Sequence, residues 1–178
     1  MKTMVIYKSA TGFTREYAQW IAEALSAELF AAAETTLRKM QEYDCIVFGG
    51  RLYAVGIDGI SFITKNFEKL KGKKLIVFAT GASPSNETVI QEVRNKNLTL
   101  QQQTHVEFFY LRGGFNFKAL PLFDKILMSL LKNKITRKQK KGVRLTSDEA
   151  GMLALYDKQI DFTKKENINV IIEAVRLD

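Results

Sequence analysis

Short apolar runs alternate along this chain with longer segments of helical periodicity, and this alternation is the strongest constraint on its fold. The apolar runs are rich in β-branched residues and fall at about residues 3–8, 30–34, 45–49, 74–80 and 105–111. Strands separated by helices in this way form a parallel sheet that is covered on both faces. We therefore expect an α/β fold with a doubly wound, five-stranded parallel sheet, whose ligand lies beyond the carboxyl ends of the strands.

The helical pattern predicts helices over about 12–29, 60–70, 87–97, 120–131 and 147–162. Ser85 or Asn86 is a suitable cap for the third of these, and the residues Thr146-Ser147-Asp148-Glu149 predict a capping box for the last. A basic linker is expected over 132–141. The apolar tail, 167–178, fits neither a helix nor a strand, and an edge strand or a self-association element would hide its side chains.

Composition limits the class of protein. A length of 178 residues with 46% hydrophobic residues suits one domain, 1–178, with an ample core. No apolar run approaches the roughly 20 residues of a membrane-spanning helix, and the N-terminus lacks the apolar segment of a signal peptide, so we expect a cytoplasmic protein. Cys45 lies in an apolar strand, which favours a core residue over a redox thiol. With one cysteine and one histidine, His105, we expect no metal site.

The first strand ends in a loop rich in hydroxyl groups, which leads into a helix and reads Ser9-Ala10-Thr11-Gly12-Phe13-Thr14. Backbone N–H groups and the positive end of the helix dipole converge at such a junction, and this favours a phosphate monoester. The loop lacks the lysine of a nucleoside triphosphate loop and the three glycines of a dinucleotide fingerprint. Hydroxyls and glycine at a helix start also serve as ordinary caps, so that interpretation stays open.

Two further loops at the predicted ligand edge are rich in glycine and hydroxyl groups. They follow the third and fourth strands, at 49–56 and 80–86. Glycine lets the backbone approach a flat ring, and Tyr53 is the aromatic residue best placed to stack on one. Tight turns at Gly49 and Gly50, and a Tyr53 packed on the domain surface, would explain the same residues without a ligand.

The loop over 9–14 resembles the T/S-x-T-G-x-T loop of the flavodoxin family, which holds the 5′-phosphate of FMN. The resemblance implies a flavodoxin-like strand order of 2-1-3-4-5, FMN as the cofactor and an FMN-dependent oxidoreductase activity. It implies that the phosphate contacts Ser9, Thr11, Gly12, Phe13 and Thr14. It also implies that the flavin ring lies near Gly50, Arg51, Leu52, Tyr53, Gly81 and Ala82.

Over residues 1–163 the chain is similar to one flavodoxin branch, which includes the FMN-dependent, oxygen-independent protoporphyrinogen oxidases that pass electrons to a membrane quinone. The similarity is carried by residues 44–53, 110–117 and 120–131. It implies protoporphyrinogen IX dehydrogenation, with a porphyrin substrate and a quinone or other redox partner. The alternatives are a flavodoxin-type electron-transfer protein and a non-catalytic flavodoxin-like module that docks to a partner or a membrane. No side chain stands out as a general acid or base.

An inserted segment, at about 112–145, combines an apolar stripe with a basic cluster. The stripe comprises Leu120, Phe123, Ile126, Leu127, Leu130 and Leu131, and the cluster comprises Lys132, Lys134, Arg137, Lys138, Lys140 and Lys141. Together with the net charge of +8, this pattern suits peripheral contact of 132–141 with the inner face of a membrane, or an acidic electron-transfer partner. A helix that covers the sheet, followed by a solvated basic loop, is the alternative that explains the same residues. Nucleic acid is not expected, because no aromatic residues for base stacking are interleaved with the charges.

Overall fold

The fold is that of a computed structural model, which describes residues 1–53, 55–156 and 158–177. Ala54 of the predicted ligand loop, Asp157 of the predicted helix 147–162 and Asp178 of the tail lie outside the described residues. The main sheet contains β1 (Thr3–Lys8), β2 (Glu28–Ala31), β3 (Cys45–Tyr53), β5 (Lys74–Gly81) and β6 (Val106–Arg112).

The five strands are parallel and run in the order β2-β1-β3-β5-β6, with the short β4 (Gly56–Ile57) paired antiparallel to the end of β3. When the five long strands alone are numbered, without β4, this order is 2-1-3-4-5, as expected. The prediction of a doubly wound parallel sheet is confirmed.

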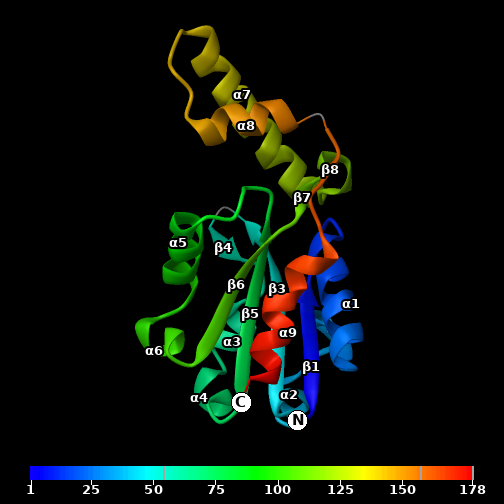
Figure 1. The fold of residues 1–178 in the computed structure, drawn as a ribbon. Helices are drawn as coiled ribbons and strands as arrows, with labels where there is room; N and C mark the ends of the chain where they lie inside the picture. The colour runs from blue at the N-terminus through cyan, green and yellow to red at the C-terminus, as the bar shows by residue number, and fades with distance from the viewer. Residues whose placement is uncertain (54, 157, 178) are drawn as a thin grey trace.

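Helices cover both faces of the sheet (Figure 1). One face carries α1 (Phe13–Leu25) and α9 (Asn169–Arg176), and the other carries α2 (Leu37–Met40), α3 (Ser61–Thr64), α4 (Phe67–Leu70) and α5 (Glu87–Asn97), with α6 (Leu100–Gln103) beside β6. Successive strand residues serve opposite faces, as their period of two requires. Met4 and Ile6 pack toward α2 to α5, whereas Val5 packs toward α1 and α9.

Between β6 and α9 the chain leaves the sheet and returns. We call this segment, residues 114–161, the arm. It contains β7 (Gly114–Phe115), η2 (Phe117–Ala119), α7 (Leu122–Lys140), α8 (Ser147–Leu155) and β8 (Ile160–Asp161). The antiparallel pairing of β7 with β8 brings the two ends of the arm together, and α7 and α8 project beyond the carboxyl edge of the sheet (Figure 1). The arm includes most of the predicted inserted segment 112–145 and continues past it.

The apolar tail is a helix, so the prediction of an edge strand or a self-association element is wrong. A short 3₁₀ helix, η3 (Lys165–Ile168), leads into α9, in which Ile171, Ile172, Ala174 and Val175 are buried. These side chains join the core on the α1 face of the sheet. The face is hidden by the chain's own sheet, which explains the apolar character of the tail.

Several predicted boundaries are also wrong. The predicted basic linker at 132–141 is almost entirely the second half of α7, because lysine and arginine propagate a helix well. The first helix ends at Leu25, where Ser26 adopts a left-handed conformation, and the second strand starts at Glu28. The predicted helix over 60–70 is divided at Asn66, whose side-chain amide donates to the Phe62 carbonyl. The last predicted helix ends at Leu155.

Both capping predictions are supported by contacts. The Asn86 side chain accepts a hydrogen bond from the Val89 N–H at 2.9 Å and so caps α5. Thr146 and Glu149 form the reciprocal capping box at the start of α8. The pKa of Glu149 is lowered by its hydrogen bond to Lys138 and by the N–H of Thr146, so this carboxylate is held in its charged form.

Candidate functional site

The loop between β1 and α1 lies at the carboxyl edge of the sheet and leaves the start of α1 uncapped. Gly12 precedes the helix with φ of 101°, a conformation that favours glycine, and no side chain caps the first turn. The first N–H groups of a helix have no acceptor within the helix. They therefore point out of the end of α1 and are suited to an anion.

The hydroxyl groups of this loop differ in what they contact. Ser9 Oγ accepts a hydrogen bond from the Gly12 N–H at 3.2 Å and holds the loop in its turn. Thr11 is half-buried and lines a surface hollow of about 390 Å³ next to the helix start. The other side chains around this hollow come from α1 and from the arm: Phe13, Arg15, Glu16, Gln19, Asn116, Gln159 and Asp161.

Thr14 and Phe13 contact the protein through their side chains. The Thr14 hydroxyl is buried and lies 2.6 Å from the hydroxyl of Thr80, at the end of β5. Phe13 packs against the backbone of Gly113 and Gly114, where a Cβ atom would lie 3.2 Å and 2.6 Å from its side chain. Their side chains are therefore engaged within the protein, and their backbone N–H groups belong to the uncapped first turn of α1.

The predicted residues of the next loop lie mostly within a strand. Gly49 and Gly50 belong to β3, so the tight turn that is the alternative explanation of these glycines without a ligand is absent. A Cβ atom at Gly49 would lie 2.1 Å from the Phe78 ring, and one at Gly50 would lie 2.5 Å from Ile57. Close packing inside the protein therefore explains why both positions are glycine.

Leu52 and Gly81 bring the ends of β3 and β5 together. A Cβ atom at Gly81 would lie 3.1 Å from the Leu52 side chain and 2.5 Å from the Tyr110 hydroxyl. Tyr110 donates to the Ser83 carbonyl at 2.8 Å, and Arg112 donates to the Ala82 carbonyl at 3.2 Å, so β6 supports the loop that follows β5. Burial raises the pKa of Tyr110 to about 12, which keeps its hydroxyl a neutral donor.

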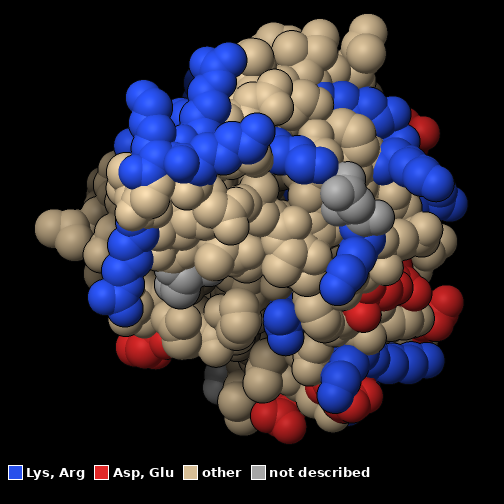
Figure 2. Space-filling view, turned by 90° about the horizontal axis from the view of Figure 1, so that it is seen from above, with Lys and Arg blue, Asp and Glu red and all other residues tan. Residues whose placement is uncertain are grey.

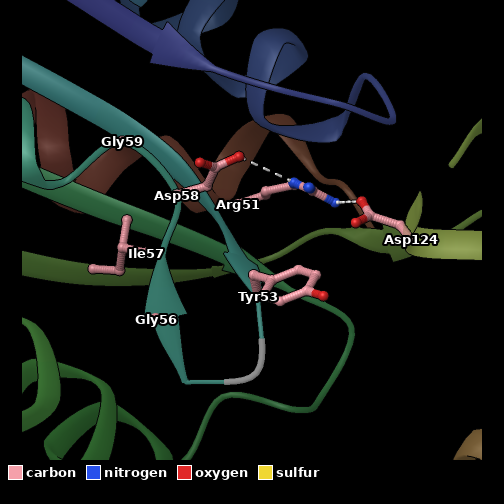
Figure 3. Close-up of a pocket in the computed structure, with 7 residues that line it drawn as sticks. All are labelled: Arg51, Tyr53, Gly56, Ile57, Asp58, Gly59 and Asp124. Carbon is pink, nitrogen blue, oxygen red and sulfur yellow. Dashed lines mark hydrogen bonds and ion pairs between the residues drawn. The ribbon is translucent and has the colours of Figure 1, made fainter. Parts of the chain in front are cut away.

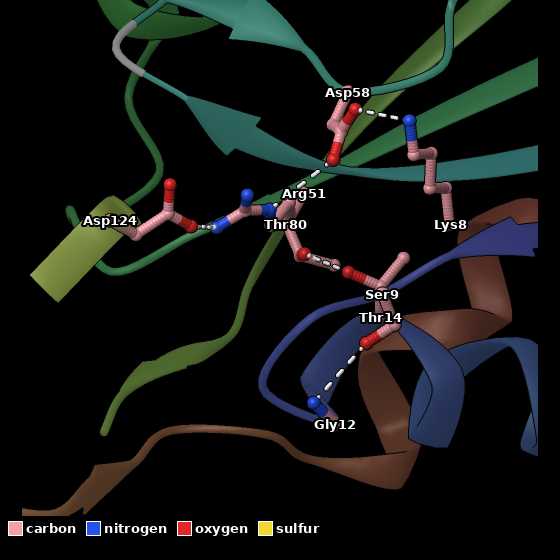
Figure 4. A network of polar contacts seen from close by, with 8 residues as sticks. All are labelled: Lys8, Ser9, Gly12, Thr14, Arg51, Asp58, Thr80 and Asp124. Atoms are coloured by element: carbon pink, nitrogen blue, oxygen red, sulfur yellow. Dashed lines mark hydrogen bonds and ion pairs between the residues drawn. The ribbon is translucent and has the colours of Figure 1, made fainter. Parts of the chain in front are cut away.

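Arg51 is the centre of a chain of charges that crosses this edge. Its Nη1 lies 2.6 Å from Asp124 of α7, and its Nε lies 3.4 Å from Asp58, which in turn lies 2.8 Å from Lys8 Nζ. The Arg51 side chain lies between the two carboxylates (Figure 3). Arg51 is also the register partner of Thr80, so the ion pairs lie beside the pair of threonine hydroxyls (Figure 4).

Tyr53 lies at the end of β3 with 43% of its surface exposed. The Arg51 guanidinium carbon lies 5.6 Å from the centre of its ring. Together they line a hollow of about 410 Å³, whose other residues are Gly56, Ile57, Asp58, Gly59 and Asp124 (Figure 3). The ring is accessible to a ligand at the predicted edge.

Four polar residues of the site are absent from the predicted ligand contacts: Lys8, Asp58, Thr80 and Asp124. Of these, Thr80 lies in the predicted ligand loop at 80–86. Thr80 carries a usable signal, since it ends a predicted strand and its hydroxyl reaches the ligand edge. The pairing of Arg51 with Asp124 joins residues 73 positions apart, and no local pattern indicates it.

The donors at the start of α1 suit a phosphate group, and the described residues hold no group of metal ligands. Uncapped N–H groups, the Thr11 hydroxyl and the positive end of α1 are all suited to a dianion. No cluster of three or more His, Cys, Asp or Glu side chains that could hold a metal ion occurs in the described part of the chain. Within the same residues, none of the helices has the length and apolar character needed to cross a membrane.

Comparisons with known proteins give both similar solved structures and a family. Similar solved structures include the Trp repressor binding protein of Bacillus subtilis, with 17% identity, a TM-score of 0.49, and coverage of 65% of this chain and 85% of that chain. They also include the two-electron reduced flavodoxin of Megasphaera elsdenii, with 21% identity, a TM-score of 0.43, and coverage of 67% and 88%. No curated protein matches the chain. The family model of the flavodoxin domain matches residues 4–142, and the chain therefore belongs to the flavodoxin domain family.

Proposed function

We propose that this protein binds FMN at the carboxyl edge of its sheet and acts as a redox flavoprotein. The observation that carries the proposal is the uncapped start of α1 beside Thr11, at the edge where β3 and β5 also end. Bound FMN would supply reversible transfer of one or two electrons. The protein's part is to bind the cofactor, orient it and set the polarity around it.

The contacts divide the proposed site into two ends. The phosphate would be held by the N–H groups of Phe13, Thr14 and Arg15 and by the Thr11 hydroxyl, while Ser9 supports the loop. The ring would lie near Tyr53 and the Gly81–Ala82 backbone. Arg51 would contribute a fixed positive charge there, because Asp58 and Asp124 hold its guanidinium in place.

We further propose dehydrogenation of protoporphyrinogen IX, with electrons passed to a quinone, as the specific activity. The similarity of residues 44–53, 110–117 and 120–131 to the protoporphyrinogen oxidase branch supports it, and the arm lies beside the proposed ring end of the site through Asp124. Electron transfer to an acidic redox protein is the second candidate, and the net charge of +8 favours that partner.

The first test is binding of FMN by the full chain. The purified protein is mixed with FMN, the excess is removed by gel filtration, and the flavin absorbance is recorded, with affinity from fluorescence titration. We expect retained flavin, and the Ser9→Ala, Thr11→Ala double variant should bind on the order of tenfold to a hundredfold more weakly. The Thr11 change removes a hydrogen bond to a charged group, and the Ser9 change removes the contact that holds the loop in its turn.

A matched variant, Ser61→Ala with Thr88→Ala, removes two exposed hydroxyl groups from α3 and α5, away from this loop, and should leave FMN affinity unchanged. A protein that retains no flavin would contradict the proposed function, and so would equal losses in the two double variants.

The specific activity is tested separately on the FMN-loaded protein. Protoporphyrinogen IX and a quinone are added, and the porphyrin fluorescence of the oxidised product is followed. Production of porphyrin that depends on both FMN and quinone supports the dehydrogenase. Flavin binding without such production would leave electron transfer as the function.

A further inference from the structure

One side of α7 has a large apolar area that the protein does not cover. Leu122, Phe123, Ile126 and Leu130 are 75%, 67%, 52% and 59% exposed. Scattered apolar residues on a surface are ordinary, but four neighbours on one helix indicate an interaction surface.

The opposite side of α7 is held by the rest of the protein. Asp124 and Ile135 are buried, and Asp124 pairs with Arg51. Ser129 lies 3.0 Å from the Tyr156 hydroxyl, and Lys138 lies 2.6 Å from Glu149 of α8. These contacts fix the rotation of α7 about its axis, so its outer side is a defined surface.

The residues on the outer side of α7 change from apolar to cationic along the helix. A helix advances by 3.6 residues per turn, so positions three, four, seven and eight apart share one side. The apolar residues occupy the first half of this side, and four exposed cations continue the same side in the second half: Lys134, Arg137, Lys140 and Lys141. We call these eight residues the docking face. The acidic residue of α7, Asp124, points away from it toward Arg51.

The distribution of charges over the protein surface limits which partner the docking face can bind. Seen from above, Lys and Arg side chains form a band over the upper half of the view, while most Asp and Glu side chains lie in the lower half (Figure 2). A second copy of the chain suits the docking face poorly. An antiparallel pair would cover the apolar half of one helix with the cations of the other, and a parallel pair would place cations together.

An anionic bilayer fits both halves of the docking face. Apolar side chains enter the boundary of the acyl chains, and neighbouring lysine and arginine side chains reach the lipid phosphates with their charged ends. We propose that α7 docks the protein peripherally on membranes that contain anionic lipid, through the docking face. This inference goes beyond the proposed function, because it requires neither FMN nor a substrate.

Vesicle binding by the purified full chain tests the proposal. The protein is sedimented with vesicles of phosphatidylcholine alone and with vesicles that also contain phosphatidylglycerol. We expect binding that rises with phosphatidylglycerol content and weakens with salt. Replacing the four cations of the docking face by alanine should lower partitioning on the order of a thousandfold. The triple variant Leu122→Ser, Ile126→Ser, Leu130→Ser should lower it by at least roughly tenfold.

Two matched variants show whether the effect belongs to α7. The first replaces four exposed cations of the domain body by alanine: Arg38, Lys65, Lys69 and Lys96. The second replaces three exposed apolar residues away from the arm by serine: Leu100, Val170 and Leu177. Both should bind vesicles like the unchanged protein. Circular dichroism checks that every variant is folded.

Three results would overturn the proposal. The first is no binding at any phosphatidylglycerol content, which would leave an acidic protein as the partner of the docking face. The second is equal loss of binding in the docking-face variants and their matched controls. The third is a dimer in gel filtration that the Leu122, Ile126 and Leu130 variant converts to a monomer.

Discussion

At Arg51, one guanidinium meets two carboxylates from distant parts of the chain. Asp58 belongs to the turn after β4, and Asp124 belongs to the first turn of the arm helix α7. Both Arg51 and Asp124 are largely buried, with side-chain exposures of 19% and 9%. A charge that is withdrawn from water needs its partner, so this contact ties the arm to the edge of the sheet.

We expect Asp124→Leu to lower the free energy of unfolding by about 3 kcal/mol, because it leaves the buried Arg51 with only the longer contact to Asp58. The double variant Arg51→Met, Asp124→Leu should recover most of that loss, since Asp58 keeps Lys8 at 2.8 Å. Urea denaturation of the two single variants and the double variant measures the coupling. A double variant as unstable as Asp124→Leu alone would show that the ion pair does not join the arm to the sheet.

At the scale of elements, the two apolar helices beyond β6 have opposite environments. In α9 the apolar residues recur on one side and are buried against the sheet. In α7 apolar and cationic residues share the outer side, so the helix has no simple division into an apolar and a polar face. Sequence patterns identify a helix through such a division. This explains why the second half of α7 is mistaken for a linker.

The buried side of α9 supplies a direct test of its role. Ile171 is fully buried, whereas the adjacent Val170 is 48% exposed. We expect Ile171→Ala to cost about 2–5 kcal/mol of stability, because it leaves a cavity between α9 and the sheet. Val170→Ala should change stability by no more than about 0.5 kcal/mol. Thermal denaturation compares the two, and similar effects would mean that α9 does not complete the core.

At the scale of the whole molecule, the two ends of the arm lie side by side where it joins the rest of the chain, which we call the domain body. Phe115 and Ile160 are cross-strand partners in the β7–β8 pair, so the chain enters and leaves the arm at one place. The core clusters on the two faces of the sheet are built from residues 4–111 and 168–175. We infer that this body is one flavodoxin-like domain and that the arm is an insertion in it.

Replacing residues 116–159 by Asn-Gly tests that inference, since two residues suffice to join paired antiparallel strands. We expect a protein that unfolds cooperatively and retains FMN but no longer binds anionic vesicles. Its stability should fall, because Arg51 loses Asp124. Circular dichroism, flavin absorbance and vesicle sedimentation are measured on the same sample. An unfolded product would show that the arm is part of the domain's core structure.

Local patterns in the sequence determine the α/β class, the β1 boundaries and the caps at Asn86 and Thr146, because each depends on residues close together in the chain. The same holds for the loop 9–14, whose position follows from a strand and a helix that adjoin it. The strand order pairs residues that are far apart in the chain, and it is implied by the resemblance to the flavodoxin family. Tertiary structure alone decides that Thr80 meets Thr14, that Asp124 holds Arg51 and that the tail is hidden while α7 is not. These outcomes depend on contacts between residues far apart in the chain, which no local pattern specifies.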